Sequence, residues 1–155
     1  MKKWTIAICF VALIPMACGP NVYKELLKPG FMNSISWERT ACFGTCPMYF
    51  ADIDLVSGAG TFIGKRFTEL EGKHTFVLSA EECMAIRSKL KDIGYLDLEN
   101  EYDSPITDLP SCITTLKHKG VVVKTVRNRV NGPNELIELE LILDGYLKKY
   151  LGIVF

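Results

Sequence analysis

The sequence predicts an α+β fold, in which an antiparallel sheet of about five strands, in the order β-β-β-α-β-β-α, is packed by two helices. Strand-like segments with alternating apolar side chains occur in two groups, and an amphipathic helical segment follows each group. Because each helical segment has one apolar face, we expect both helices to cover the same face of the sheet.

The first group of strands starts after Pro47. Residues 49–55 alternate between apolar and polar side chains, which is typical of a strand with one buried face. The apolar positions are Tyr49, Ala51, Ile53 and Leu55. The glycines of residues 57–60 predict a turn, and β-branched and aromatic side chains predict strands over residues 61–67 and 74–78.

Two helices and a second hairpin complete the predicted order. Ser79 and Glu82 form a capping-box pattern, and Gly94 is placed to end the helix that they begin. Its apolar positions are Cys83, Ile86, Leu90 and Ile93. A hairpin is expected over residues 113–118 and 121–130, and Pro133 predicts the start of the last helix. The apolar positions of that helix are Leu136, Leu139, Leu143, Leu147 and Tyr150.

The N-terminal sequence predicts export. Lys2 and Lys3 precede an uncharged apolar run over residues 4–17, which is typical of a signal peptide and short for a membrane-spanning helix. Ala17 stands directly before Cys18, as a lipobox requires for cleavage and lipidation of that cysteine. Alternatives are an ordinary signal peptide cut near Ala17 and a long membrane anchor, the latter disfavoured by the helix breakers around Cys18.

These patterns predict a signal peptide over residues 1–17, a tether over 18–33, and a single α+β domain over 34–155. The protein is then expected to be exported and held at the bacterial cell envelope through an N-terminal lipid, facing the periplasm or the surface. Without the signal peptide, two of the 18 basic residues are lost, and 16 basic residues remain against 18 acidic ones. This balance argues against a nucleic-acid partner.

Four cysteines remain after Cys9 and Cys18 are set aside: Cys42, Cys46, Cys83 and Cys112. An exported protein folds in an oxidising compartment, so one or two disulfides are expected, with connectivity left open by the sequence. Proximity favours pairing of Cys42 with Cys46 around Gly44. That pair is either a structural disulfide or a redox couple, and its C-x3-C spacing differs from the usual zinc and thioredoxin motifs.

A long acidic segment over residues 95–111 is the other unusual feature, because a loop of this length calls for a reason. Carboxylates would suit a hard cation, but the spacing does not follow the EF-hand pattern, and a solvated acidic loop is the commoner case. The two histidines lie in strand patterns, and the chain has no nucleophile elbow or phosphate-binding loop. We therefore predict no catalytic residue, no metal site and no cofactor.

The motif Cys-Phe-Gly-x-Cys-Pro-x-Tyr of residues 42–49, Asp108-Leu109-Pro110 before a strand, and the closing helix after Gly132-Pro133 resemble the bacterial family catalogued as domain of unknown function 6438. The similarity covers about residues 34–150. It implies an exported or lipid-anchored protein, and it implies no activity and no catalytic residue.

We interpret the chain as a non-enzymatic binding module that contacts a protein or small ligand through the cysteine loop and the acidic loop. The alternative is a thiol-disulfide redox protein using Cys42 and Cys46. The candidate binding residues are Arg39, Phe43, Gly44, Pro47, Tyr49, Asp103, Thr107 and Asp108.

Overall fold

A computed structural model describes residues 32–105 and 108–155. These residues form a seven-stranded sheet, with strand order β4-β3-β2-β1-β6-β7-β5. The strands are β1 (Ser34–Arg39), β2 (Met48–Asp54), β3 (Ala59–Arg66), β4 (Gly72–Val77), β5 (Glu101–Tyr102), β6 (Cys112–His118) and β7 (Val121–Asn128). The helices are α2 (Ala80–Asp92), the 3-10 helix η1 (Tyr95–Asp97) and α3 (Asn134–Leu151).

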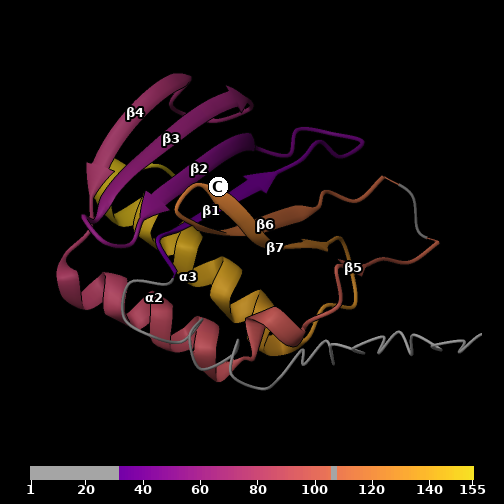
Figure 1. Cartoon of the computed structure of the whole chain (residues 1–155). Coiled ribbons are helices and arrows are strands. Elements are labelled where there is room, and N and C mark those ends of the chain that lie inside the picture. Colours follow the sequence, from indigo (N-terminus) through magenta and orange to yellow (C-terminus); the bar gives the residue numbers. More distant parts are fainter. Residues whose placement is uncertain (1–31, 106–107) are drawn as a thin grey trace, which may run out of the picture.

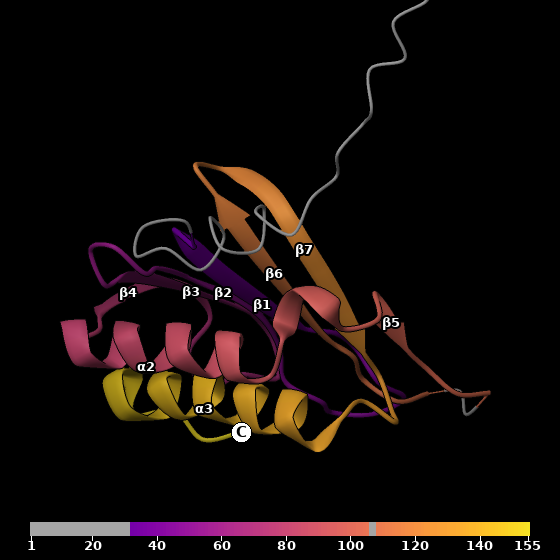
Figure 2. The same ribbon diagram turned by 60° about the horizontal axis from the view of Figure 1, so that its bottom comes forward.

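Both long helices lie against one face of the sheet, and the opposite face is open (Figure 1; Figure 2). The core fills the space between the two layers. Its largest members on the sheet are Ile35, Trp37, Tyr49, Ile53 and Phe62, and its members on the helices include Ile86, Leu90, Leu136, Leu139, Leu143 and Leu147. The predicted inner faces of the first strand after Pro47 and of both helices are therefore confirmed.

The local signals that place the helices are also confirmed. The Ser79 side chain accepts the backbone N–H of Glu82, and the Glu82 carboxylate accepts the backbone N–H of Ser79, which completes the capping box. Gly94 has a left-handed backbone with φ +60° directly after α2. The turn at Lys119-Gly120 has positive φ at both residues, the geometry that suits a tight hairpin.

The predicted sheet of about five antiparallel strands is too small, because β1 was not expected. Strand β1 is central: it pairs antiparallel with β2 on one side and with β6 on the other. Its inner positions are Ile35, Trp37 and Arg39, and the charged third position hides the apolar alternation that marks a strand. Residues directly before the cysteine loop therefore form the middle of the domain.

The acidic segment also has more structure than the sequence suggested. It contains η1 and the two-residue strand β5, which pairs parallel with β7 and makes the sheet mixed. Tyr95 is buried, and its hydroxyl donates to Thr114 Oγ1 at 2.7 Å. A strand of two residues is too short to give a periodic signal, so sequence patterns could not show it.

The predicted signal peptide, Cys18 and nearly all of the predicted tether lie outside the described residues. The described chain starts with Met32, which is buried, and with Asn33, whose carbonyl accepts the backbone N–H of Leu55 at 2.7 Å. Within residues 32–105 and 108–155, no helix has the length and apolar character needed to cross a bilayer.

Candidate functional site

The structure brings together the two loops that the sequence singled out. The cysteine loop joins β1 to β2, and the acidic segment runs into β6, which is paired with β1. The backbone N–H of Phe43 donates to the carbonyl of Asp108 at 3.2 Å. Next to it, Thr40 and Ser111 exchange two hydrogen bonds of 3.0 and 2.8 Å. We call the edge formed by residues 40–47 and 108–111 the two-loop edge.

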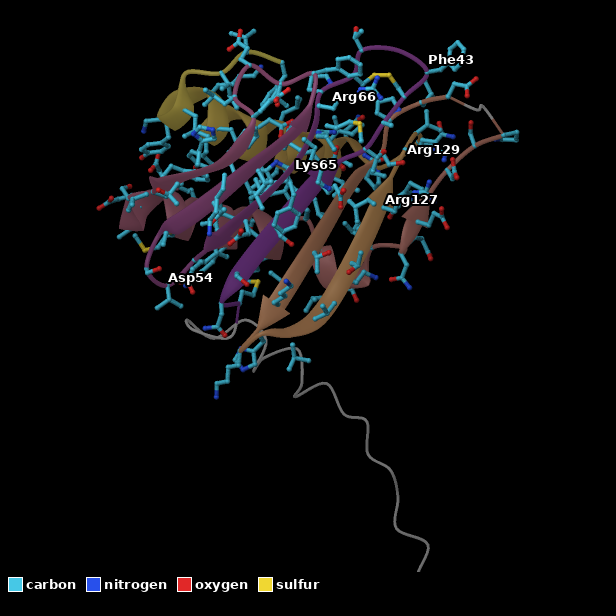
Figure 3. All side chains as sticks on the ribbon, turned by 90° about the horizontal axis from the view of Figure 1, so that it is seen from above. Phe43, Asp54, Lys65, Arg66, Arg127 and Arg129 are labelled. Atoms are coloured by element: carbon cyan, nitrogen blue, oxygen red, sulfur yellow. A yellow bond between two sulfur atoms is a disulfide. The ribbon has the colours of Figure 1, made fainter. Side chains whose placement is uncertain are left out.

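The cysteine loop is closed by the predicted disulfide between Cys42 and Cys46, with the two Cα atoms 5.8 Å apart. Phe43 and Gly44 lie at its tip. The Phe43 side chain is 90% exposed, the largest exposure among the large apolar residues described. In Figure 3 it projects from the end of the sheet opposite Asp54. A short covalent ring and a backbone hydrogen bond therefore hold an aromatic side chain out in solvent.

A buried polar network lies directly behind this edge, with Asp144 of α3 at its centre. One oxygen of the Asp144 carboxylate accepts the indole N–H of Trp37 at 2.9 Å and the hydroxyl of Tyr49 at 2.5 Å. The other oxygen accepts two N–H groups of Arg39, at 3.2 and 2.7 Å. Asp144 thus joins the helix to the central strands β1 and β2.

Glu140, one helical turn before Asp144, extends the network. Its carboxylate accepts an N–H of Arg39 at 3.2 Å and the side-chain amide of Asn128 at 2.9 Å. Burial raises the pKa of Glu140, although the hydrogen bonds from Asn128 and Arg39 work against that rise. Burial alone would lower the pKa of Arg39, but the surrounding acidic groups raise it above its usual value. The guanidinium therefore stays charged.

Tyr49 of the network and the neighbouring Cys112 are held neutral. Burial, and then the charge of Asp144, raises the pKa of Tyr49 well above its usual range. Burial likewise raises the pKa of the Cys112 thiol well above its usual value, and Cys112 has only 1% exposure. A protonated, inaccessible thiol is a poor nucleophile, so Cys112 is unsuited to react with the disulfide or a substrate.

A small cleft of about 180 Å³ opens between the two loops and the network. It is lined by Arg39, Cys46, Pro47, Tyr49, Pro110, Asp144 and Phe155. The ring of Phe155 stacks on Tyr49 with centroids 4.6 Å apart, so the C-terminal segment forms one wall. Arg39 keeps 24% of its side chain exposed. The cleft is mainly apolar, with the charged side chains of Arg39 and Asp144 in its lining.

The candidate binding residues predicted in the acidic segment do not all lie at the two-loop edge. Asp103 forms an ion pair with Arg129 at 3.4 Å, and Asp108 adopts a left-handed backbone with φ 72° beside the cysteine loop. Thr107 lies outside the described residues. Among the residues described, no three His, Cys, Asp or Glu side chains are grouped as a metal site would require. Of the two that the structure describes, Asp103 is thus part of a surface ion pair and Asp108 reaches the two-loop edge.

Sequence patterns missed four members of the network: Trp37, Asn128, Glu140 and Asp144. One signal was present. Glu140 and Asp144 follow Leu136 at intervals of four, so two carboxylates lie within the apolar face of the last predicted helix. A charged pair on a face that must be buried indicates a buried cationic partner.

Comparison with known protein families matches residues 33–147 to the family described as a domain of unknown function, DUF6438. The chain belongs to the DUF6438 family. The match confirms the resemblance found in the sequence, and it spans the sheet, the two-loop edge and the whole buried network. Phe155, which forms one wall of the cleft, lies beyond the part of the chain that matches DUF6438. No curated protein and no solved structure gave a match.

The disulfide of this DUF6438 domain is expected to be a structural constraint. The double variant Cys42→Ser/Cys46→Ser should fold and lose about 2 kcal/mol of stability, because the disulfide restricts the unfolded chain. The loss should be no larger, because a ring this short removes little conformational entropy from the unfolded chain. Urea unfolding of the wild type with and without reductant, beside the double variant, measures this. Thr45→Ser in the same loop is the control.

The same measurement separates the two interpretations of the cysteine pair. Neither Cys42 nor Cys46 lies at the start of a helix, where a thiol pKa would be lowered. We expect the disulfide to resist mild reductant. A reduction potential above about −230 mV would favour the redox protein instead.

Glu140 should make the stability of the domain depend on pH. Because its pKa is higher in the folded than in the unfolded state, its contribution is complete below the unfolded pKa of about 4.3 and is lost as pH rises through the folded value. Glu140→Gln should remove this loss. Among the described residues Asn128 Oδ1 has no hydrogen-bond partner, so a flipped Asn128 amide can accept from the new side chain.

Urea unfolding of the wild type and Glu140→Gln over a range of pH tests this. As pH rises, the unfolding free energy of Glu140→Gln should increase relative to that of the wild type. A difference that stays constant from about pH 4 to pH 7 would contradict the raised pKa.

Proposed function

We propose that this DUF6438 protein is a lipid-anchored, non-enzymatic recognition domain of the bacterial envelope, which binds a partner protein through the two-loop edge. The observation that carries the proposal is the position of Phe43, a phenylalanine 90% exposed at the tip of a disulfide-closed loop. Aromatic side chains, phenylalanine among them, are enriched in protein interfaces, where they bury a large apolar area.

The bonds that restrain the two-loop edge favour recognition by a preformed surface. The disulfide, the Phe43–Asp108 backbone bond and the Thr40–Ser111 pair restrict the loop before any partner arrives. A restricted loop loses less conformational entropy on binding, which raises affinity. The apolar cleft beside it, with Pro47 and Pro110 in its walls, gives a partner a second point of contact.

The groups of the site favour binding over catalysis. The carboxylate of Asp144 already accepts hydrogen bonds from three side chains, and Arg39 donates to two carboxylates. Cys112 is buried and protonated. These interactions fix the strands that carry the loops, and among the described residues they leave no group near the cleft in the arrangement of a nucleophile and its base.

Site-specific photocrosslinking tests the function. A benzophenone amino acid in place of Phe43, in cells that produce the full chain, should give one dominant crosslinked species. The same amino acid in place of Leu141, which is 62% exposed on α3, should not give that species. Phe43→Ala should weaken binding of the captured partner tenfold or more, since an anchor residue contributes on the order of 2 kcal/mol.

Two results would refute recognition through this edge. One is equal crosslinking from positions 43 and 141. The other is a captured partner that binds Phe43→Ala as tightly as wild type. Circular dichroism of each variant shows whether a loss of binding reflects misfolding.

The lipid anchor is tested separately. Metabolic labelling with a fatty-acid probe should tag the wild type, and Cys18→Ala should abolish the label, because the lipobox pattern ends at this cysteine. Wild-type protein that takes up no probe would exclude the anchor while leaving the two-loop edge untested.

A further inference from the structure

The tip of the β6–β7 hairpin, residues 117–124, exposes apolar side chains that no described segment covers. Val121 is 69% exposed and Val122 is 54% exposed. Figure 2 shows the hairpin extending past the neighbouring strands at one end of the sheet. Two exposed β-branched side chains at a hairpin tip contribute nothing to the core. Exposed apolar surface of this kind is typical of a site that contacts another molecule or a membrane.

Along the sequence, the charged residues next to these valines are all basic. Lys117, Lys119 and Lys124 flank them, and the sequence has no acidic residue from 113 to 131. Lys124 donates to the side chain of Asn100 at 2.7 Å and to the carbonyl of Leu98, so it is held against the acidic segment. Lys119 lies at the turn itself, and Lys117 lies near the end of β6, where it interacts electrostatically with Asp52 of β2. The tip is therefore apolar and cationic.

The hairpin tip lies where the N-terminal part of the chain joins the domain. The backbone N–H of Asn33 donates to the carbonyl of Lys117 at 3.1 Å, and the Asn33 side chain accepts the N–H of Lys119 at 2.9 Å. Residues 1–31, with the predicted lipid attachment at Cys18, connect to the domain at this point. The exposed Val56 lies on the turn after β2, which ends beside the start of β1.

We propose that the hairpin tip contacts the surface of the bilayer that carries the N-terminal lipid, with the valines at the headgroup boundary and the lysines near anionic headgroups. The proposal rests on the lipid anchor of the proposed function. Lysine is depleted in protein interfaces but is attracted to anionic headgroups, so a tip with three lysines suits lipid better than a protein.

This contact would orient the domain. Strand β1 runs from the hairpin end to the two-loop edge, a span of about 20 Å for six residues. In Figure 3, Phe43 and Asp54 lie at opposite ends of the sheet, and Asp54 pairs with Ser34 at the start of β1. With the tip on the membrane, Phe43 points away from it, toward a partner.

Spin-label accessibility tests the contact with the full chain purified from membranes. A nitroxide is placed at Val122→Cys or at Leu141→Cys, which have comparable exposure. Each protein is reconstituted into phosphatidylcholine vesicles with or without phosphatidylglycerol. In the anionic vesicles, the label at 122 should become several-fold less accessible to a water-soluble nickel chelate and more accessible to oxygen. The label at 141 should not change.

Lys117→Gln/Lys119→Gln in the Val122→Cys background should reduce that protection, and the reduction should be larger with phosphatidylglycerol than without it. Equal nickel accessibility at 122 and 141 in both kinds of vesicle would overturn the proposal. Protection at 122 that requires other envelope proteins would also overturn it, in favour of a protein contact. Fatty-acid labelling of the same preparation shows whether such a failure lies in the anchor or in the hairpin.

Discussion

Asp144→Ala should destabilise the domain by about 3 to 5 kcal/mol, the range expected when one member of a buried ion pair is removed. For a domain of this size, such a loss is a large fraction of the whole stability. The substitution leaves three side chains of the central strands without an acceptor: the indole N–H of Trp37, the hydroxyl of Tyr49 and part of the Arg39 guanidinium. Each is costly to bury unpaired.

Urea unfolding followed by circular dichroism measures the effect. Glu138→Ala is the matched control, because Glu138 lies on the same helix and forms an ion pair with Lys89 at 2.6 Å that is exposed to solvent. That variant should change stability by less than about 1 kcal/mol. Similar losses for Asp144→Ala and Glu138→Ala would mean that the buried network contributes little.

A double-mutant cycle identifies the source of the loss. Arg39→Met removes the partly buried cation while keeping an apolar side chain of similar length. If Asp144→Ala acts mainly by leaving Arg39 uncompensated, the double variant should be less destabilised than the sum of the two single variants. Strict additivity would instead assign the loss to Trp37 and Tyr49.

The sequence was informative wherever local rules decide the structure. Capping at Ser79, the helix end at Gly94 and the hairpin at Lys119-Gly120 each depend on residues within a few positions, and the structure has all three. The Cys42–Cys46 pair belongs to the same class, because its members are close in the unfolded chain. The family resemblance and the two-helix α+β class are likewise confirmed.

What the sequence did not show depends on contacts between distant residues. Arg39 and Asp144 are 105 positions apart, and only the pairing of β1 between β2 and β6 brings the arginine under α3. For the same reason, the approach of Phe43 to Asp108 was not predicted, although each loop was singled out by itself. Such contacts depend on which strands pair and in which register, and the periodicity of apolar residues in the sequence does not determine the pairing of distant strands.

The wall of the cleft depends on one such contact near the end of β3. The turn after β3 lies so close to the strand that a Cβ at Gly64 would be 1.8 Å from the carbonyl oxygen of Leu70 and 2.6 Å from Thr68 Oγ1. The same turn carries Glu69, whose carboxylate accepts the backbone N–H of Val154 at 3.0 Å. The next residue is Phe155, which stacks on Tyr49. Gly64 therefore supports the C-terminal wall of the cleft.

Gly64→Ala should lower stability by about 3 kcal/mol, because the methyl group meets backbone atoms that cannot rotate away. Gly145→Ala is the matched control: Gly145 lies exposed within α3, and its added methyl group would meet no described neighbour within 4 Å, so alanine should stabilise the helix by roughly 0.5 to 1 kcal/mol. The same chemical change should thus have opposite signs at the two sites in urea unfolding. Equal destabilisation by the two substitutions, or no destabilisation by Gly64→Ala, would show that the close approach of the turn to β3 does not govern the stability of this edge.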